Sequence, residues 1–167
     1  MSHVEHRAAS PQSVRCYVVT VSDTRNEETD TSGRAIARML IAAHHELVGR
    51  AIVRDEPGQV RNAIERQLAN PDVQAILVTG GTGISSRDGT YEVVSRLLHK
   101  ELTGFGELFR MLSYEQVGAA AMLSRAVAGL VAGRIVLSLP GSEAAVRLAM
   151  DKLILPELGH LVREATR

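Results

Sequence analysis

The strongest local signal for chemistry is a glycine-rich segment at residues 79–83. It reads Thr-Gly-Gly-Thr-Gly and follows directly after a short apolar run. Glycines at the carboxyl end of a strand let backbone N–H groups approach an anion, and ligands of open α/β sheets bind at that edge. The segment has neither the lysine of a Walker loop nor the glycine spacing of a dinucleotide fingerprint. We expect it to bind phosphate; the alternative is a turn that only reverses the chain.

Two carboxylates stand where a metal ion would assist such a phosphate. Asp55 follows a second apolar run, and Asp88 lies shortly after the glycine segment. Thr90 is better placed than Asp88 to cap the helix that follows, which leaves Asp88 free for a ligand. Carboxylates from neighbouring strand ends, together with substrate phosphates, are the ligands that Mg²⁺ prefers. The alternative for Asp55, just before Pro57, is a solvated loop residue.

Two more polar segments follow apolar runs. Ser22 and Asp23 open a polar loop that reaches residues 30–33, where Ser32 can cap a helix. Residues 140–142, Pro-Gly-Ser, open a later helix whose amides and dipole favour an anion. We expect all four segments to converge on one edge of one sheet.

Side chains for other kinds of catalysis are missing from these segments. The six His residues fall in the N-terminal tail, at helix ends and in the C-terminal helix, so a Ser-His-Asp triad is not expected. No His pair has the spacing of a zinc site, and His44-His45 is expected to be solvated. Cys16 lies inside the first apolar run and is expected in the core.

Alternating short apolar runs and amphipathic stretches must position these segments. Residues 14–22, 47–53 and 75–79 have the length and composition of buried strands. Each is followed by apolar residues at helical spacing, the second such helix ending at Asn70-Pro71 and the third beginning near Thr90. Successive strand-helix units imply parallel strands with helices on both faces. The fold class is α/β.

The pattern changes after residue 101. Residues 102–124 carry no strand signal and predict one or two helices in a small side lobe. Residues 125–131 and 134–139 flank Ala132-Gly133, which suits a two-residue hairpin and therefore one antiparallel strand. Ser142 can cap a final helix. We predict a three-layer α/β/α sandwich with a mostly parallel sheet, one antiparallel strand and the helical side lobe.

Composition sets the class of protein. The chain has 167 residues with 19 Lys+Arg against 19 Asp+Glu, and only 3% are aromatic, which argues against nucleic-acid binding. Its longest apolar stretch, at residues 118–133, is interrupted by Ser124 and Arg125 and is too short to span a membrane. Residues 1–12 are polar and lack a secretory core. We expect a flexible tail over residues 1–12, a single domain over residues 13–167, and a soluble cytoplasmic protein.

The order of these motifs resembles the molybdenum cofactor biosynthesis proteins of the MoaB/Mog type, most closely the MoaB branch. The resemblance covers residues 14–161, and the motifs are specific in this order and at these separations. They are Val21-Ser22-Asp23, Asp30-Thr31-Ser32-Gly33, Asp55-Glu56, Thr79-Gly80-Gly81-Thr82-Gly83, Arg87-Asp88-Gly89-Thr90, Gly104-Phe105-Gly106-Glu107, Leu123-Ser124-Arg125-Ala126 and Leu139-Pro140-Gly141-Ser142. The chain departs from the family pattern at Gly89 and at residues 143–145.

The resemblance implies a molybdopterin-binding α/β sandwich that forms homotrimers, sometimes paired into hexamers. It implies an Mg²⁺-dependent molybdopterin adenylyltransferase, in which the substrate's terminal phosphate attacks the α-phosphorus of ATP and pyrophosphate leaves. Met111, Leu112 and Met122 are candidate subunit contacts. The alternative is a non-catalytic carrier or scaffold that binds molybdopterin or nucleotide in the same pathway.

The resemblance also implies roles for individual residues. Asp55 and Asp88 would be the catalytic carboxylates that hold Mg²⁺ and orient the phosphates. Glu107 would close the pocket from the side lobe. The remaining binding residues for ATP and molybdopterin would be Ser22, Asp23, Gly80, Gly81, Thr82, Gly83, Arg87, Pro140, Gly141 and Ser142.

Overall fold

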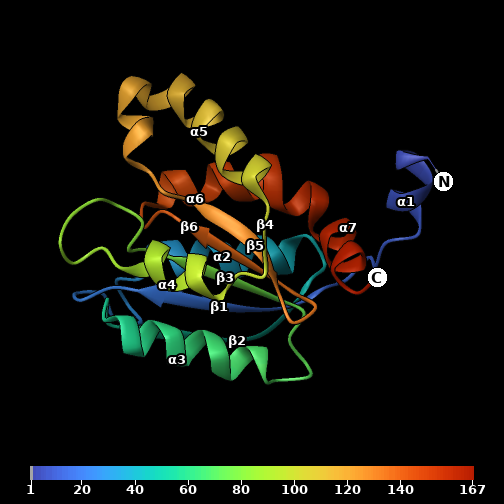
Figure 1. The fold of residues 1–167 in the computed structure, drawn as a ribbon, viewed down its shortest axis with the longest axis horizontal. Helices are drawn as coiled ribbons and strands as arrows, with labels where there is room; N and C mark the ends of the chain where they lie inside the picture. Colours follow the sequence, from blue (N-terminus) through green and yellow to red (C-terminus); the bar gives the residue numbers. More distant parts are fainter. Residues whose placement is uncertain (1) are drawn as a thin grey trace.

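The computed structural model describes residues 2–167 and arranges them around a single sheet (Figure 1). The elements are α1 (His3–Ala8), β1 (Arg15–Val21), α2 (Thr31–Ala42), β2 (Glu46–Val53), α3 (Pro57–Leu68), β3 (Ala75–Thr79), α4 (Thr90–Leu97), β4 (Lys100–Glu101), α5 (Thr103–Val117), the 3₁₀ helix η1 (Gly118–Leu123), β5 (Val127–Val131), β6 (Arg134–Leu139), α6 (Glu143–Ala149), the π-helical turn η2 (Met150–Ile154) and α7 (Leu155–Ala165).

The sheet has six strands in the order β2-β1-β3-β6-β5-β4. The pairs β1–β2, β1–β3 and β3–β6 are parallel, and β5 runs antiparallel to both of its neighbours. The turn between β5 and β6 has positive φ at Ala132 (49°) and Gly133 (74°), as a two-residue hairpin requires. The predicted mostly parallel sheet with one antiparallel strand is confirmed.

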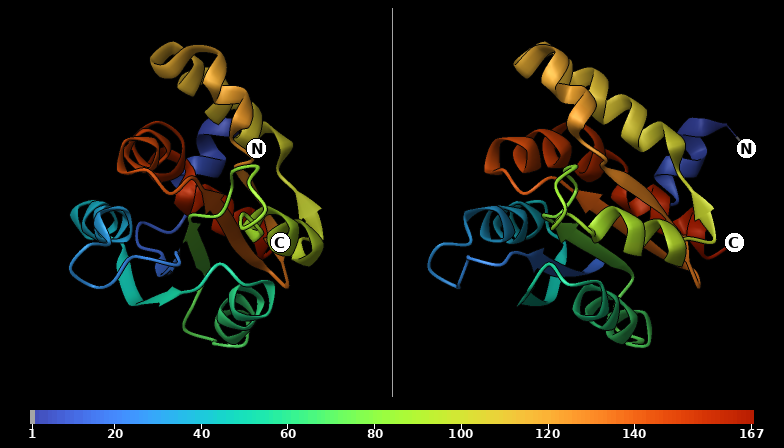
Figure 2. Two further views of the ribbon diagram at one scale, coloured as in Figure 1. Left: turned by 90° about the vertical axis from the view of Figure 1, so that its left-hand side faces the viewer. Right: turned by 60° about the vertical axis from the view of Figure 1, so that its left-hand side comes forward.

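Helices cover both faces of this sheet because alternate residues of each strand point to opposite sides. In β1, Cys16 and Val18 join the core under α2, α6 and α7, whereas Val19 and Val21 join the core under α3 and α4. The central strand β3 is buried along its whole length. The chain is therefore the predicted three-layer sandwich, and the side lobe of α5 and η1 lies outside these layers (Figure 2).

The helix caps confirm one prediction from the sequence and contradict two others. Ser142 caps α6 by accepting a hydrogen bond from the Ala145 amide, as predicted. Ser32 does not cap α2, because Asp30 takes that position and accepts from the Gly33 amide at 3.0 Å. Thr90 does not cap α4 either, since it is the first helical residue and Gly89 precedes it as the cap.

Helix α1 lies beside α7, at the same side of the molecule as the C-terminus (Figure 1). Helix α1 occupies part of the segment expected to be a flexible tail, and Arg7 donates to the Pro156 carbonyl and pairs with Glu157. Cys16 is fully buried, as expected, and burial raises its pKa to about 12. Within residues 2–167, no helix combines the length and apolarity that crossing a bilayer demands.

Candidate functional site

Four loops meet at the carboxyl edge of the parallel strands. They follow β1 (residues 22–30), β2 (54–56), β3 (80–89) and β6 (140–142), and the first and third project from the left side of Figure 1. Hydrogen bonds link them: the Ser22 amide donates to the Val53 carbonyl at 2.9 Å, and the Gly80 amide donates to the Leu139 carbonyl at 3.0 Å. The structure thus brings together the segments that the sequence expected to converge.

The glycine loop is shaped by positions that only glycine can occupy. Gly80 and Gly81 have φ of 104° and 69°, a region that L side chains rarely adopt. A Cβ on Gly80 would collide with the Val21 carbonyl. A Cβ on Gly81 would collide with the Thr90 hydroxyl and come within 2.8 Å of Asp55 Oδ2. The loop backbone is therefore packed directly against the expected carboxylate site.

Asp55, in the loop after β2, is a buried carboxylate, with 8% of the residue exposed. Its Oδ1 accepts from the Gly89 amide at 3.2 Å, and its own amide donates to Asp23 Oδ1 at 3.1 Å. Burial raises the pKa of Asp55, and the charges of Asp88 and Asp23 raise it further against the lowering effect of the Gly89 bond. A bound cation would relieve this unfavourable concentration of negative charge.

Asp88 is half-buried and turns back on its own loop. Its Oδ2 accepts from the Ser85 amide at 2.9 Å and from the Ser85 hydroxyl at 2.6 Å. Asp88 does not cap α4, as expected, but its carboxylate is bonded within its own loop. The charge of Asp88 contributes to the raised pKa of Asp55.

The guanidinium of Arg87, in the loop after β3, is paired with the carboxylate of Asp23, in the loop after β1. Its Nε and NH2 groups donate to the two Asp23 oxygens at 3.0 and 2.9 Å. This bidentate pair lowers the pKa of Asp23, chiefly through its hydrogen bonds. The structure therefore joins two predicted site residues to each other, with the positive charge of Arg87 balanced before any phosphate arrives.

The turn at residues 140–142 is held by side chains from β3 and α2. The Thr79 hydroxyl donates to the Pro140 carbonyl at 2.7 Å, and the Ser32 hydroxyl donates to the Gly141 carbonyl at 2.6 Å. Gly141 itself packs on Gly80, because a Cβ there would stand 3.4 Å from the Gly80 Cα. The turn and the glycine loop form one continuous surface.

Arg125 braces the glycine loop, a role that the sequence did not reveal. Its guanidinium donates to the Gly83 carbonyl at 2.6 Å and to the Asp88 carbonyl at 3.3 Å, and it pairs with Glu92. It also lies 4.8 Å from the centroid of the Tyr91 ring. Only its place in a motif shared with the MoaB/Mog family pointed to it, because nothing local marks a residue that acts on a loop so distant in sequence.

Asp30 anchors the loop after β1 from within the core. It is fully buried, accepts from the Thr20 hydroxyl at 2.8 Å and pairs with Arg50 at 3.2 Å. Arg50 also contacts Glu27 in that loop at 3.4 Å. This network fixes the base of the segment that carries Ser22 and Asp23.

Glu107 is not brought to the other predicted residues. It is exposed on α5, and none of the hydrogen bonds or ion pairs between described residues joins it to the four loops. Its proposed role stays a prediction. In residues 2–167 no group of three or more His, Cys, Asp or Glu side chains has the arrangement of a metal site. A cation at Asp55 and Asp88 would therefore need further oxygens from substrate or water.

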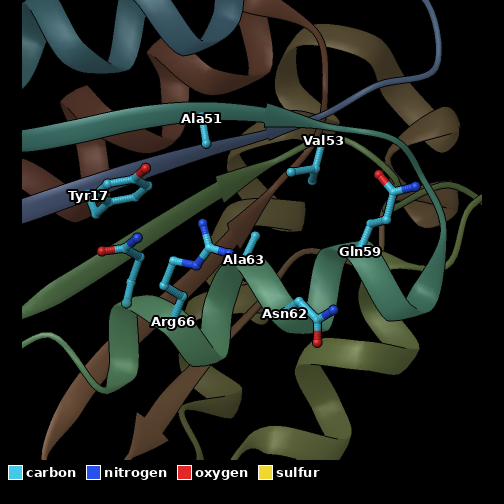
Figure 3. Close-up of a pocket in the computed structure, with 8 residues that line it drawn as sticks. Tyr17, Ala51, Val53, Gln59, Asn62, Ala63 and Arg66 are labelled. Atoms are coloured by element: carbon cyan, nitrogen blue, oxygen red, sulfur yellow. The ribbon is translucent and has the colours of Figure 1, made fainter.

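Two of the hollows in the described part of the chain differ in what lines them. One, of about 200 Å³, lies between the side lobe and α6, where Phe109, Ser113 and Gln116 face Pro140 and Ser142. The other, in Figure 3, lies between α3 and the sheet and is lined by Tyr17, Asn62 and Arg66 among others. Only the first includes predicted site residues.

Comparisons with known proteins agree with this architecture. Residues 17–160 match the family model described as the probable molybdopterin binding domain. The chain is 52% identical to molybdenum cofactor biosynthesis protein B of Bacillus anthracis, covering 100% of this chain and 99% of that protein.

Solved structures show the same fold. A crystal structure of molybdenum cofactor biosynthesis protein B superposes with a TM-score of 0.90 at 52% identity, covering 93% of this chain and 98% of that one. The tungsten cofactor synthesizing protein MoaB of Pyrococcus furiosus superposes with a TM-score of 0.82 at 37% identity, covering 95% and 100%. The chain therefore belongs to the family of probable molybdopterin-binding domains that includes the MoaB/Mog proteins.

Proposed function

We propose that this protein acts in molybdenum cofactor biosynthesis by transferring adenylate from ATP to molybdopterin. In this reaction a terminal phosphate oxygen of molybdopterin forms a bond to the α-phosphorus of ATP. The bond from that phosphorus to the bridging oxygen breaks, and pyrophosphate leaves with it. The observation that carries the proposal is the enclosure of Asp55, with its raised pKa, against the glycine loop. Family membership supports the substrate class.

The chain's own residues supply positioning and charge. Because the nucleophile belongs to the substrate, no catalytic Ser or His is needed. The Gly80 amide is bonded to the Leu139 carbonyl, so the amides of residues 81–83 would face the phosphate oxygens, and Arg125 keeps that loop in place. Asp55 and Asp88 would hold Mg²⁺, which suits one or two carboxylates with substrate oxygens and which supplies neutralisation of phosphate charge when bound.

The hollow beside the turn at residues 140–142 offers room for the pterin rings. Its walls combine apolar surface from Phe109 and Leu148 with polar groups from Ser113, Gln116 and Ser142. A pterin is planar and carries both hydrogen-bond donors and acceptors along its edge, so this mixture suits it. The pterin in this hollow would place its phosphate beside the turn.

A non-catalytic carrier is the second candidate, and one observation favours it. The Asp88 carboxylate is bonded to Ser85 through Oδ2, and Arg87 is balanced by Asp23, so both charges already have partners within the loops. A carrier would need the hollow and the turn but not the paired carboxylates.

Assembly and compartment complete the proposal. Large apolar side chains are exposed along the side lobe, which supports a homotrimer or hexamer built on that face. They are Leu108, Met111, Tyr114, Val117, Met122 and Leu123. A cytoplasmic setting is supported by the free, buried Cys16, because disulfides are rare in reducing compartments.

Incubation of the purified protein with molybdopterin and MgATP separates the two functions. The enzyme hypothesis predicts equal amounts of pyrophosphate and adenylylated molybdopterin, and none after chelation of Mg²⁺. Equilibrium dialysis of molybdopterin without ATP provides the binding control. Binding of molybdopterin with no product in the presence of MgATP would establish the carrier and reject the enzyme.

A further inference from the structure

Arg25, in the loop after β1, has a charge that no other part of the site uses. We propose that Arg25 binds the phosphate group of the pterin substrate, an assignment that rests on the function proposed above. It makes Arg25 a residue that selects phosphorylated over dephosphorylated pterin.

The side chain is held close to the turn at residues 140–142. The Arg25 backbone amide donates to the Ser22 hydroxyl at 3.0 Å, and its NH1 donates to the Ser32 hydroxyl at 3.1 Å. The same Ser32 hydroxyl donates to the Gly141 carbonyl at 2.6 Å. A single hydroxyl therefore separates the guanidinium from the turn, and the half-buried side chain is tethered at both ends.

The partners of Arg25 leave its charge unbalanced. Its guanidinium meets only the neutral hydroxyls of Ser32 and Thr31, the latter at 3.5 Å, and the described chain places no carboxylate in contact with it. Guanidinium groups bind phosphate through parallel N–H donors, and neutral hydroxyls satisfy only part of that capacity. Arg25 is thus held in place to bind an anion.

The other arginines around the site are occupied elsewhere. Arg87 is paired with Asp23, and Arg125 with Glu92 and loop carbonyls. Arg147, the base nearest in sequence to the turn, is paired with Glu143 at 2.9 Å. Arg54 lowers the pKa of Asp23 by its charge, but it follows edge strand β2, which in the sheet lies three strands away from β6 and the turn.

The location favours the pterin phosphate over those of the nucleotide. The hollow proposed for the pterin is lined by Pro140 and Ser142, on the turn that Ser32 links to Arg25. The nucleotide phosphates are assigned to the glycine loop, Asp55 and Asp88. The first residues of α6 are Glu143, Ala144 and Ala145, which provide no cation. Arg25 therefore supplies the positive charge for this end of the site.

A binding cycle tests the assignment without requiring turnover. Equilibrium dialysis would measure dissociation constants of the native protein and Arg25→Ala for molybdopterin, for its dephosphorylated form and for MgATP. We expect Arg25→Ala to weaken molybdopterin binding by about 10- to 100-fold, the range for hydrogen bonds to a charged group. Binding of the dephosphorylated form and of MgATP should be unchanged, and Arg25→Lys should retain part of the preference.

Arg34→Ala is the matched control, because Arg34 also supports this loop, through the Glu28 carbonyl at 3.3 Å. It should leave all three constants unchanged. Arg25→Gln keeps a donor without the charge and serves if Arg25→Ala unfolds, which circular dichroism would reveal.

Three results would overturn the assignment. Equal weakening of phosphorylated and dephosphorylated pterin would make Arg25 a structural residue of the loop. Weakening of MgATP alone would assign it to the nucleotide. Equal dissociation constants of the native protein for the phosphorylated and dephosphorylated pterins would show that no phosphate contact contributes to binding. If the native protein shows the expected cycle but forms no adenylylated product, the adenylyltransferase proposal falls and the Arg25 assignment stands.

Discussion

Replacing Gly81 with alanine tests whether the glycine loop is truly packed against the carboxylate site. The alanine would have to adopt φ of 69°, and its Cβ would collide with the Thr90 hydroxyl and Asp55 Oδ2. Left-handed backbone costs about 1–2 kcal/mol for a residue with a Cβ. Overpacking adds about 1–3 kcal/mol. We therefore expect Gly81→Ala to lower the free energy of unfolding by about 2–5 kcal/mol.

Gly133→Ala separates the two contributions. Gly133 has φ of 74°, but a Cβ there would find its nearest neighbour, the Ala165 carbonyl, at 3.7 Å, an ordinary contact. This variant should show the backbone effect alone, about 1–2 kcal/mol. At the size of this chain each kcal/mol corresponds to about 2–4 °C in Tm.

Urea denaturation followed by far-ultraviolet circular dichroism is the suitable assay, since the chain has no Trp. A double variant, Gly81→Ala with Thr90→Ala, should recover part of the loss because it removes the colliding hydroxyl. The reasoning fails if Gly81→Ala is no more destabilising than Gly133→Ala, or if the double variant recovers nothing.

Three further changes have clear directions. Because the pKa of Asp55 is raised in the folded state, the native protein should lose stability as pH rises through that pKa. Asp55→Asn should abolish this loss and raise Tm at neutral pH without Mg²⁺. If the variant and the native protein show the same dependence of Tm on pH, the prediction is wrong. Arg125→Ala should destabilise by about 1.5–3 kcal/mol and slow adenylyl transfer, with Arg125→Lys no substitute; a native-like melting curve would refute this. Ala132→Asn should raise stability by about 1 kcal/mol, because Ala132 has positive φ and Asn adopts positive φ more readily than Ala. A lower urea midpoint for the variant than for the native protein would contradict this.

The layered fold was predictable because local patterns and tertiary demands agree. The apolar run at residues 75–79 is a strand with those bounds, buried throughout, and the turn at Ala132-Gly133 is a hairpin as its length predicted. Parallel order followed from the repeated strand-helix units. The convergence of four loops followed in turn, because carboxyl ends of parallel strands share one edge.

The hydrogen bonds within the site could not be predicted in the same way. Sequence spacing placed Ser32 and Thr90 near helix starts, but the chain used Asp30 and Gly89 as caps. The reason is tertiary: Asp30 is committed to Thr20 and Arg50, which lie on neighbouring strands. When partners distant in sequence determine which residue caps a helix, the local sequence does not reveal that residue.

Charge pairing across loops was equally hidden. Arg87 was expected to meet phosphate, yet the fold places it against Asp23 from another strand end. Arg125 was marked only by the family motif, although it is bonded to the loop that carries Asp88. Sequence thus indicated which segments form the site, while the partner of each charge emerged only from the structure.

Pyrophosphate release with molybdopterin and MgATP is the measurement that tests the central claim most directly. The native protein and Asp72→Asn, which removes the same charge from an exposed loop before β3, should release it at equal rates. Asp55→Asn should be slower by about 10²-fold or more, the effect expected for loss of a preorganised charge at a reacting centre. Equal rates for Asp55→Asn and Asp72→Asn would contradict the account.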